Sequence, residues 1–431
     1  MLKQINLKNW KSFKDATLYI DPLTILIGTN SSGKSNIIDA LDFLSRIPEA
    51  KSLESALMGD SHTPGIRGGL EWVVRKPETQ FTLEAVISGE YEQEDEQVEF
   101  DCLYTVTTEI EPKIQLINEF IKLLKSNENH KSNNSSENKI SRIESFIYPS
   151  SGSIKMTLGK YELSALNQLF PKNQFLLMNQ KYLPFYDFSS LSSTNWSYTT
   201  TIEVLRTIFI INPIPQNMRK YSPLSKTLEQ DGSNIAGVLA AFPEPEKEKI
   251  EGTLLNYLSQ LPEGDLQRVW AEPVGRLGSD AMLYCEEKWG KNQEPLLVDA
   301  RGMSDGTLRF LAILTALLTR PEGSLIVIEE VDNGLHPSRA GLLLQMLREI
   351  GKKRNIDILV TTHNPALMDE LTPDFIPFVM VVYRDQDTGE SQLIPLDEIE
   401  NLPKLIASGS LGKITQQGLL EKSLAEHREY Q

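Results

Sequence analysis

Residues 23–38 read LTILIGTNSSGKSNII. The first five, LTILI, are mostly apolar and suit a short buried strand that ends before Gly28. From Ser35 onward the apolar residues recur at helical spacing, at Ile37, Ile38, Leu41, Leu44 and Ile47. Between strand and helix, the run Gly28-Thr29-Asn30-Ser31-Ser32-Gly33-Lys34-Ser35 matches the P-loop pattern. The stretch therefore predicts a phosphate-binding loop between a strand and a helix, as in α/β folds.

The residues of this loop have separate chemical tasks. Glycines allow successive backbone N–H groups to turn toward phosphates, and the amino end of the helix adds partial positive charge. Lys34 is predicted to reach the β- and γ-phosphates, and the Ser35 hydroxyl to coordinate magnesium. The alternative is a glycine-rich turn that holds no ligand. We expect residues 28–35 to bind ATP together with Mg²⁺.

A second acidic element follows much later in the chain. The run SLIVIEE, residues 324–330, is an apolar strand that ends in two carboxylates. In P-loop enzymes an acid at this place holds the magnesium shell, and a following glutamate can deprotonate water. By position, Glu329 is the expected metal-side acid and Glu330 the general base. Asp332 is the nearest rival for either role, and the plain alternative is that the acids cap the strand.

The constellation resembles the ABC-type ATPases of the SMC/RecF group, including the ATPase half of OLD-family proteins. These are AAA-family ATPases often found in prokaryotic anti-phage defence. Five segments carry the resemblance: INLKNWKSF at 5–13, DGSNIAGVL at 231–239, RGMSDGTLR at 301–309, VDNGLHP at 331–337 and TTHNP at 361–365. The last three look like that group's signature motif, the loop that follows the acidic strand and the switch-histidine segment, and the first two are also similar to this group. Their common order is more specific than any single motif.

The resemblance implies a mechanism in which two heads sandwich two ATP molecules. The signature residues Ser304, Asp305 and Gly306 of one head would contact the γ-phosphate held by the other. His363 would sense the γ-phosphate or position the attacking water, whereas His336 is interpreted as part of a turn before Pro337. The resemblance also places Lys11, Ser12 and Phe13 near the base.

One departure from the group's pattern concerns the metal-side acid. That acid is commonly Asp in the group, and here it is Glu329. Which of Glu329 and Glu330 meets magnesium therefore stays open.

Composition limits the class of protein. The chain has 431 residues, with 43 Lys and Arg against 59 Asp and Glu, and a net charge of −16. An acidic balance argues against a surface that grips nucleic acid throughout. With only Cys102 and Cys285, a disulfide framework is excluded and a reducing compartment fits. No signal peptide or membrane span is recognised, so we expect a cytoplasmic protein.

The sequence divides into three parts. We predict an N-terminal ATPase lobe at 1–111, with the P-loop and an antiparallel β subdomain. A partly helical insertion at 112–228 follows, with a helix over Ile114–Leu124 and a disordered loop near 126–139. The C-terminal ATPase lobe, 229–431, holds the signature, the acidic strand and the switch histidine. Alternating strands and helices there indicate a mostly parallel sheet, as in an ABC-type P-loop head.

Three functions fit these motifs. The first is an ATP-hydrolysing, homodimeric switch that controls a separate effector, a nuclease or toxin acting in trans in anti-phage defence. Only 68 residues follow His363, too few for a fused nuclease beside the ATPase sheet. The second is a RecF-like DNA sensor using Lys3, Lys8, Lys11 and Lys14, with Arg301 and Arg309 beside the signature; the plain reading of these lysines is a solvated edge. The third is a transporter ATPase subunit.

Overall fold

A computed structural model of the chain describes most of its residues. They are 1–61, 63–93, 96–126, 143–148, 153–158, 161–165, 192–260, 266–288, 294–334, 336–399 and 402–427. The predicted loop at 126–139 lies almost entirely outside these ranges. The chain forms two compact units, each built from separate stretches of sequence. Unit 1 holds Met1–Ile20, Ser31–Ile208 and Val382–Leu393, and unit 2 holds Asp21–Asn30, Phe209–Val381 and Ile394–Gln431.

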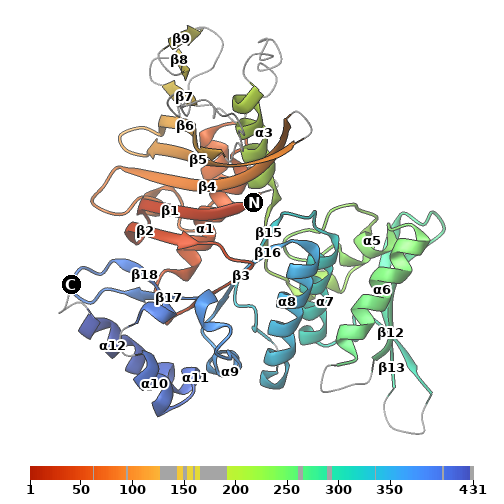
Figure 1. Ribbon diagram of the computed structural model, residues 1–431. Coiled ribbons are helices and arrows are strands. Elements are labelled where there is room, and N and C mark those ends of the chain that lie inside the picture. Colours follow the sequence, from red (N-terminus) through yellow and green to blue (C-terminus); the bar gives the residue numbers. More distant parts are fainter. Residues whose placement is uncertain are drawn as a thin grey trace. The chain divides into compact units, whose positions relative to one another are not determined.

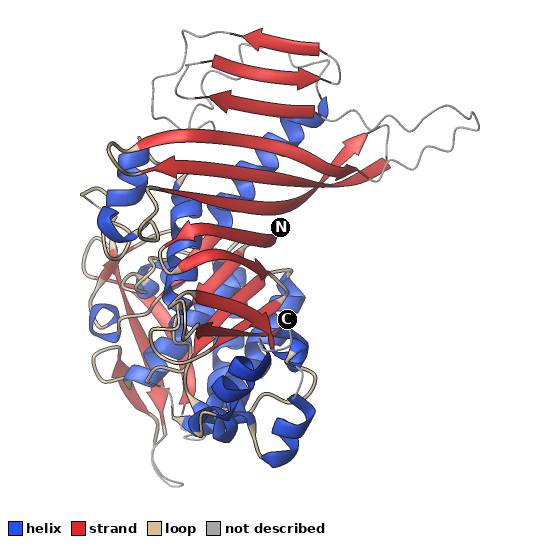
Figure 2. Cartoon of the chain, turned by 90° about the vertical axis from the view of Figure 1, so that its left-hand side faces the viewer, coloured by secondary structure: helices blue, strands red, loops and turns tan. Residues whose placement is uncertain are grey.

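Unit 1 is organised around an eight-stranded sheet in the order β2-β1-β4-β5-β6-β7-β8-β9, whose neighbours all pair antiparallel (Figures 1 and 2). The predicted antiparallel β subdomain is confirmed, and β4 and β5 form a hairpin in which Leu83 faces Val106. The strands are β1 (Leu2–Trp10), β2 (Phe13–Tyr19), β4 (Gln80–Gln93), β5 (Glu96–Glu109), β6 (Gln115–Ser126), β7 (Ile143–Tyr148), β8 (Ser153–Leu158) and β9 (Tyr161–Ala165).

One predicted element is wrong. The run Ile114–Leu124, expected as a helix, belongs to strand β6, which pairs with β5. Its apolar residues satisfy either periodicity, but isoleucine and phenylalanine favour the pleated surface of a sheet. Pairing with β6 also satisfies the backbone groups along the edge of β5, which a helix over the same residues would leave unpaired. Tertiary pairing therefore decided the structure of this run.

Helices cover the sheet of unit 1. Helix α1 (Lys34–Arg46) follows the P-loop as predicted, and its Phe43 packs with Trp10 and Phe81 of the sheet. All three rings are almost fully buried. The Trp10 indole N–H also donates to the Asn36 carbonyl oxygen at 2.7 Å, which fixes the first turn of α1. The other helices are α2 (Leu53–Met58), a 3₁₀ turn at Leu70–Trp72 and α3 (Ser192–Thr207), which packs on β4.

Unit 2 contains the predicted parallel sheet. Strands β15 (Leu325–Ile328), β16 (Asp357–Thr362), β3 (Leu23–Ile27) and β17 (Val379–Arg384) pair parallel in that order, and β10 (Ile208–Ile211) lies beside β15. Every residue of β15, β16 and β3 is buried, as expected for a sheet covered on both faces. The chain passes from β17 into unit 1, where the hairpin to β18 (Ser391–Pro395) begins.

Helices and a smaller antiparallel sheet complete unit 2. Helix α7 (Asp305–Thr319) is apolar on most sides and largely buried, and it packs against α8 (Ala340–Arg354) and β15. The small sheet contains β11 (Ser222–Pro223), β13 (Asp280–Glu287), β12 (Leu266–Val274) and β14 (Leu296–Asp299). The remaining helices are α4 (Pro215–Met218), α5 (Ile235–Ala240), α6 (Glu244–Leu258), α9 (Pro365–Asp369), α10 (Leu402–Ser408), α11 (Leu411–Gln416) and α12 (Leu419–His427).

The predicted fold class, an α/β P-loop fold with an antiparallel β subdomain, is confirmed by these sheets. Within the described residues, no helix combines the length and apolar character needed to cross a membrane. The three-part division of the sequence at residues 111 and 228 remains a proposal. The two compact units are defined by contacts in space and do not have these boundaries, since β6, beyond residue 111, belongs to the same sheet as β1, β4 and β5.

Candidate functional site

The predicted P-loop has the backbone of a tight turn. Gly28, Ser31 and Gly33 have positive φ angles of 151°, 66° and 119°. At Gly33, which precedes α1, a Cβ atom would lie 2.5 Å from Ser391 Oγ and 3.1 Å from Phe13 Cζ. Both the torsion and the lack of space therefore require glycine at this position.

Lys34 and Ser35 begin helix α1, where the resemblance to P-loop proteins places them. Lys34 is largely buried and Ser35 is exposed. The first N–H groups of a helix carry partial positive charge, so a phosphate near this end meets both the helix amino terminus and the lysine. Oxygen atoms such as that of the Ser35 hydroxyl are the donors that Mg²⁺ prefers. The first turn of α1 therefore fits a magnesium-bound triphosphate.

Serine side chains hold the loop within unit 1. The Ser391 hydroxyl, on β18, donates to the Ser32 carbonyl oxygen at 2.6 Å and lies 2.7 Å from Ser12 Oγ. The Asn36 side-chain amide donates to the same Ser12 Oγ at 2.7 Å. The turn between β1 and β2 and the strand β18 therefore both fasten the P-loop. Ser391 was not predicted, because it lies more than 350 residues from the loop in sequence and matches no motif.

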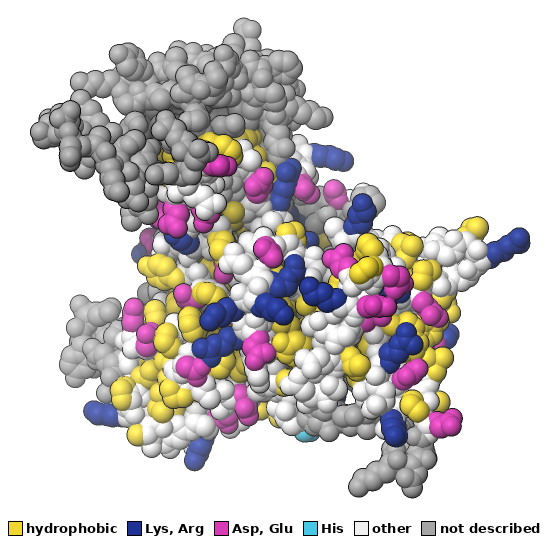
Figure 3. Space-filling view, turned by 45° about the vertical axis from the view of Figure 1, so that its right-hand side comes forward, with side chains coloured by type: hydrophobic (Ala, Val, Ile, Leu, Met, Phe, Trp, Pro, Cys, Tyr) yellow, Lys and Arg dark blue, Asp and Glu magenta, His cyan; other side chains and the backbone are white. Residues whose placement is uncertain are grey.

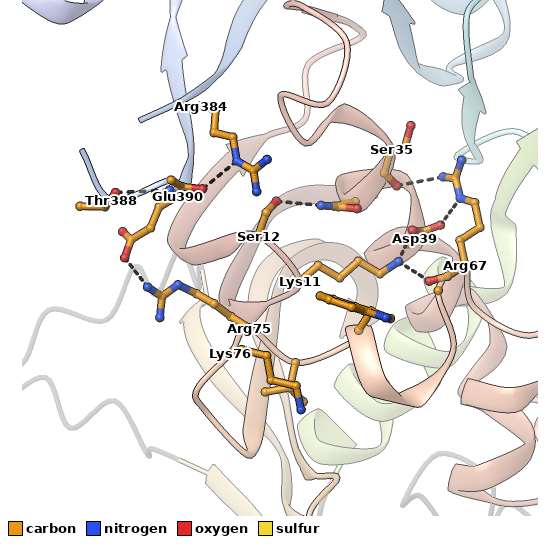
Figure 4. A pocket seen from close by; sticks show the side chains of 15 residues that line it. Lys11, Ser12, Ser35, Asp39, Arg67, Arg75, Lys76, Arg384, Thr388 and Glu390 are labelled. Carbon is orange, nitrogen blue, oxygen red and sulfur yellow. Dashed lines mark hydrogen bonds and ion pairs between the residues drawn. The ribbon is translucent and has the colours of Figure 1, made fainter. Parts of the chain in front are cut away.

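A cavity of about 520 Å³ opens beside the first turn of α1, entirely within unit 1 (Figure 4). Lys11 and Ser12, predicted to lie near a base, line it together with Ser35. Its other walls come from the segment around Trp72 and from the β17–β18 hairpin. The remaining lining residues are Asn36, Asp39, Arg67, Gly68, Trp72, Val74, Arg75, Lys76, Arg384, Thr388, Gly389 and Glu390.

A buried carboxylate organises the cations of this cavity. Asp39 accepts from Lys11 Nζ at 2.5 Å and from Arg67 Nε at 2.7 Å, and Figure 4 shows both side chains pointing to it. Arg67 also donates to the Ser35 carbonyl oxygen at 2.9 Å. Burial lowers the pKa of Lys11, and the hydrogen bond and charge of Asp39 oppose that shift. Asp39 and Arg67 were not predicted, although Asp39 lies four residues after Ser35, one helical turn away.

The predicted catalytic pair is brought together in unit 2. Glu330 follows β15 and His363 follows β16, and His363 Nδ1 lies 3.5 Å from Glu330 Oε1. Parallel strands end at the same edge of a sheet, which is why two residues far apart in sequence meet there. Each side chain is a little under half exposed, at 44% for Glu330 and 45% for His363. The pair is therefore accessible to a ligand.

The backbone at Glu330 is unusual. Its φ angle is 47°, a left-handed conformation that side chains other than glycine seldom adopt. The Glu330 N–H donates to Thr361 Oγ1 at 2.9 Å, and Thr361 is buried in β16. Strain of this kind persists where neighbours impose it, and it is frequent at functional sites. Thr361 thus helps to set the direction of the Glu330 side chain.

The rival acid has a structural partner. Asp332 is largely buried and accepts from Thr362 Oγ1 at 2.7 Å. This bond holds the Asp332 carboxylate within the fold. His336 Nδ1 accepts from Ser338 N at 3.3 Å at the start of a 3₁₀ turn, Pro337–Arg339, in agreement with its interpretation as a turn residue.

The signature residues begin helix α7. Ser304 is its N-cap, and Ser304 Oγ accepts from Thr307 N at 3.1 Å and lies 2.8 Å from Thr307 Oγ1. Ser304 and Asp305 are exposed, whereas Gly306 is buried. The Ser304 hydroxyl therefore stands at a helix amino terminus, where it accepts from the Thr307 N–H and shares a hydrogen bond with the Thr307 hydroxyl.

A strand, a P-loop, a helix and an acid at the end of another parallel strand of the same sheet define a P-loop nucleotide-binding protein. Comparison with known proteins identifies the family within this class. A family model described as "AAA ATPase domain" matches residues 1–263, and a second AAA domain model, whose description refers to an AbiEii toxin of a type IV TA system, matches residues 230–369. The chain belongs to the AAA ATPase domain family.

Curated relatives agree with the predicted resemblance to SMC-type ATPases, which is confirmed. The chain is 36% identical over 110 residues to the chromosome partition protein Smc of Rhodopirellula baltica, covering 21% of this chain and 9% of that protein. It is 47% identical over 55 residues to the Smc protein of Methanococcus voltae, covering 12% and 5%. The matched segments thus span less than a tenth of these relatives' length.

Solved structures give a partial overlap. The SMC head bound to the C-winged helix domain of ScpA has a TM-score of 0.44 and 14% identity, with 91% of this chain and 96% of that chain covered. The SMC head domain from Thermotoga maritima has a TM-score of 0.41 and 14% identity, with 91% and 98% covered. The family assignment depends on the sequence comparisons.

Proposed function

We propose that this protein binds ATP with Mg²⁺, hydrolyses it, and works as an ATP-driven dimer switch that controls a separate effector. The contact between His363 and Glu330, 3.5 Å apart at the ends of adjacent parallel strands, carries the proposal. A carboxylate beside an imidazole at the edge of a P-loop sheet is suited to activating water. Family membership in the AAA ATPases supports the same chemistry.

The proposed roles follow from residue chemistry. Residues Gly28–Ser35 cradle the phosphates, and Lys34 neutralises charge on the β- and γ-phosphates. Ser35 and Glu329 are the proposed magnesium ligands, and the ion would neutralise phosphate charge when bound. Glu330 removes a proton from a water molecule as the water oxygen attacks the γ-phosphorus, and ADP is the leaving group. His363 positions that water or contacts the γ-phosphate.

The proposed dimer places the signature of one copy against the nucleotide of the other. Ser304 and Asp305 are exposed at the start of α7, with the helix amino terminus behind them. An exposed anion-binding surface of this kind suits the γ-phosphate of a second head. The γ-phosphate would then hold the two heads together until it is hydrolysed.

The proposed partner is a nuclease or toxin that acts in trans, in prokaryotic anti-phage defence. The description of the second family model refers to a type IV TA system and names no separate effector, so the effector in trans rests on the resemblance to OLD-family proteins. The described residues after His363 form strands and short helices, among them β17, β18 and α9–α12. Within the described part of the chain, no group of three or more His, Cys, Asp and Glu suits a metal ion.

A second candidate function is DNA binding. The names of the Smc relatives refer to chromosome partition, which supports this alternative. The lysines that suggested a DNA-binding groove are largely neutralised, because Lys3 pairs with Asp101 at 2.9 Å, Lys8 with Glu84 at 3.1 Å and Lys11 with Asp39. Basic and acidic side chains are also interspersed on the face drawn in Figure 3. A steep loss of DNA affinity with salt would support this function.

Mixing two inactive variants tests the proposed dimer. Lys34→Ala removes the phosphate-binding lysine, and Ser304→Arg obstructs the signature. A mixed dimer pairs the intact P-loop of the second chain with the intact signature of the first, so one composite site of two should recover. We expect no ATPase activity from either variant alone and up to about one quarter of wild-type activity from an equal mixture, since half of random dimers are mixed. A mixture without activity, from folded chains that form dimers, would exclude the sandwich.

A further inference from the structure

One guanidinium group joins the segment after α4 to the start of helix α7. Arg219 Nη2 donates to Asp305 Oδ1 at 2.6 Å and to the Met303 carbonyl oxygen at 2.8 Å. These two acceptors lie on either side of Ser304. A single side chain thus fixes the main chain before the signature serine and the carboxylate after it.

The backbone that carries Arg219 is held in place by its neighbours in α4. Met218, its neighbour, is fully buried, and α4 packs against α7. The Asn217 side-chain amide donates to Asp231 Oδ2 at 2.9 Å, which ties the same short helix to the segment before α5. The position of the guanidinium is therefore set by the fold, and the contact with Asp305 does not depend on a freely moving side chain.

Asp305 poses an electrostatic problem at this place. It is the first residue of α7, where the helix amino terminus attracts a carboxylate. A phosphate of a second copy would be attracted by the same N–H groups and repelled by the same carboxylate. Arg219 offsets the negative charge and draws Asp305 Oδ1 to itself, so the amino terminus stays accessible beside Ser304.

The pair has little to contribute to the stability of the fold. The side chain of Asp305 is 55% exposed and that of Arg219 is 24% exposed. Ion pairs with this much exposure to water contribute little to folding free energy. Their main effect is expected on the local charge and on the geometry of the segment that carries Ser304.

We propose that Arg219 is a positioning residue of the signature segment. It neutralises Asp305 and holds the backbone around Ser304, so that this segment can meet the triphosphate of a second copy of the chain. The inference rests on the proposed dimer function. It adds that Arg219 allows the signature segment to bind the triphosphate despite the negative charge of Asp305.

The test uses Glu330→Gln as the parent, because slow hydrolysis keeps ATP bound. Light scattering measures ATP-dependent association, and a fluorescent ATP analogue measures nucleotide affinity of the single head. Adding Arg219→Ala should weaken association roughly 10-fold, through the unpaired Asp305 charge, while nucleotide affinity stays within about 2-fold. Adding Asp305→Asn to that variant should restore most of the association. A merely structural role for Arg219 predicts no such restoration, because the Met303 carbonyl oxygen remains unpaired.

Lys220→Ala is the matched control. Lys220 is the next residue, is exposed, and contacts Asn217 Oδ1 at 3.4 Å rather than the signature. Its removal changes net charge equally and should leave association at the parent level. Melting temperatures of all variants are compared, and Arg219→Gln, which keeps a donor for Met303 without the charge, should weaken association as Arg219→Ala does.

Two results would overturn the inference alone. One is a parent that associates with ATP while its Arg219→Ala derivative associates equally well. The other is a weakened Arg219→Ala variant that Asp305→Asn does not restore. If the Glu330→Gln parent itself shows no ATP-dependent association, the proposed dimer fails, and the Arg219 inference fails with it.

Discussion

His363 Nδ1 lies 3.5 Å from Glu330 Oε1, although 33 positions separate the two residues along the chain. The parallel pairing of β15 with β16 places both residues at one sheet edge. The left-handed backbone of Glu330, with its N–H bonded to Thr361, then directs the carboxylate toward the imidazole. The chemistry proposed for this protein depends on that relationship.

Glu330→Gln should bind ATP nearly normally and hydrolyse it about 100-fold or more slowly, because glutamine keeps the shape of glutamate but cannot accept a proton from water. Phosphate release under saturating ATP measures the rate. Glu322→Gln, an exposed change before β15, is the control and should hydrolyse at the wild-type rate. Wild-type turnover in Glu330→Gln would move the role of base to Glu329 or Asp332.

Thr361→Val should lower kcat about 10-fold with little effect on the KM for ATP, because it removes the acceptor that holds the Glu330 N–H and leaves the nucleotide contacts alone. The lost hydrogen bond should also cost about 1 kcal/mol of folding free energy. Thr361→Ser keeps the hydroxyl and is expected to retain most activity. Steady-state kinetics and denaturant unfolding measure the two effects. Equal kcat in the valine and serine variants would contradict the positioning role.

Lys34→Ala should abolish ATP hydrolysis and leave the melting temperature nearly unchanged. The lysine supplies charge for the phosphates at the start of α1. Alanine is a strong helix former and keeps this first turn helical. Lys14→Ala removes an exposed lysine of β2 from the same unit and is the matched control for net charge. Unchanged turnover in the Lys34 variant would remove the P-loop assignment.

Asp39→Asn should raise the KM for ATP about 5-fold and destabilise the protein by about 2–4 kcal/mol, because Lys11 and Arg67 lose their shared counter-ion at a largely buried position. The control is Asp42→Asn, which breaks the pair with Arg46 on the same helix away from the cavity. Urea unfolding and ATP titration of the rate measure these effects. An unchanged KM in the Asp39 variant would show that the cavity does not contact nucleotide.

Asp357 should make stability depend on pH. Burial is the main cause that raises the pKa of its carboxyl from 3.8 to about 7, and the nearby Asp21 carboxylate contributes to this rise. The folded state thus keeps a proton that the unfolded state loses, so the stabilisation is complete below about pH 4 and is lost as pH rises toward 7. Relative to the wild type, Asp357→Asn should gain about 2–4 kcal/mol over this range and stay constant above it. Urea unfolding of both proteins measures the difference. If the free energies of unfolding of Asp357→Asn and the wild type differ by the same amount at pH 5 and at pH 8, the prediction is contradicted.

Much of the fold was predictable because it depends on local patterns. The apolar run at 23–27, the loop at 28–35 and the helix after it needed only periodicity and glycine chemistry. The buried strand near 325 was equally clear from its apolar residues. The run Ile114–Leu124 was predicted wrongly, because its residues suit both a helix and a strand and only pairing with β5 decides between them.

The sequence by itself determined the P-loop, the acids at 329 and 330, the signature at 304–306 and the histidine at 363, since each belongs to a motif of adjacent residues. Only the tertiary structure decided that Thr361 orients Glu330, that Ser391 fastens the P-loop, that Asp39 holds Lys11 and Arg67, and that Arg219 faces Asp305. These hydrogen-bond partners come from distant positions in the sequence. Any hydroxyl, carboxylate or guanidinium group of suitable reach could make the same contact. These partners leave no fixed spacing in the sequence, because strand order and helix packing alone bring them within hydrogen-bond distance.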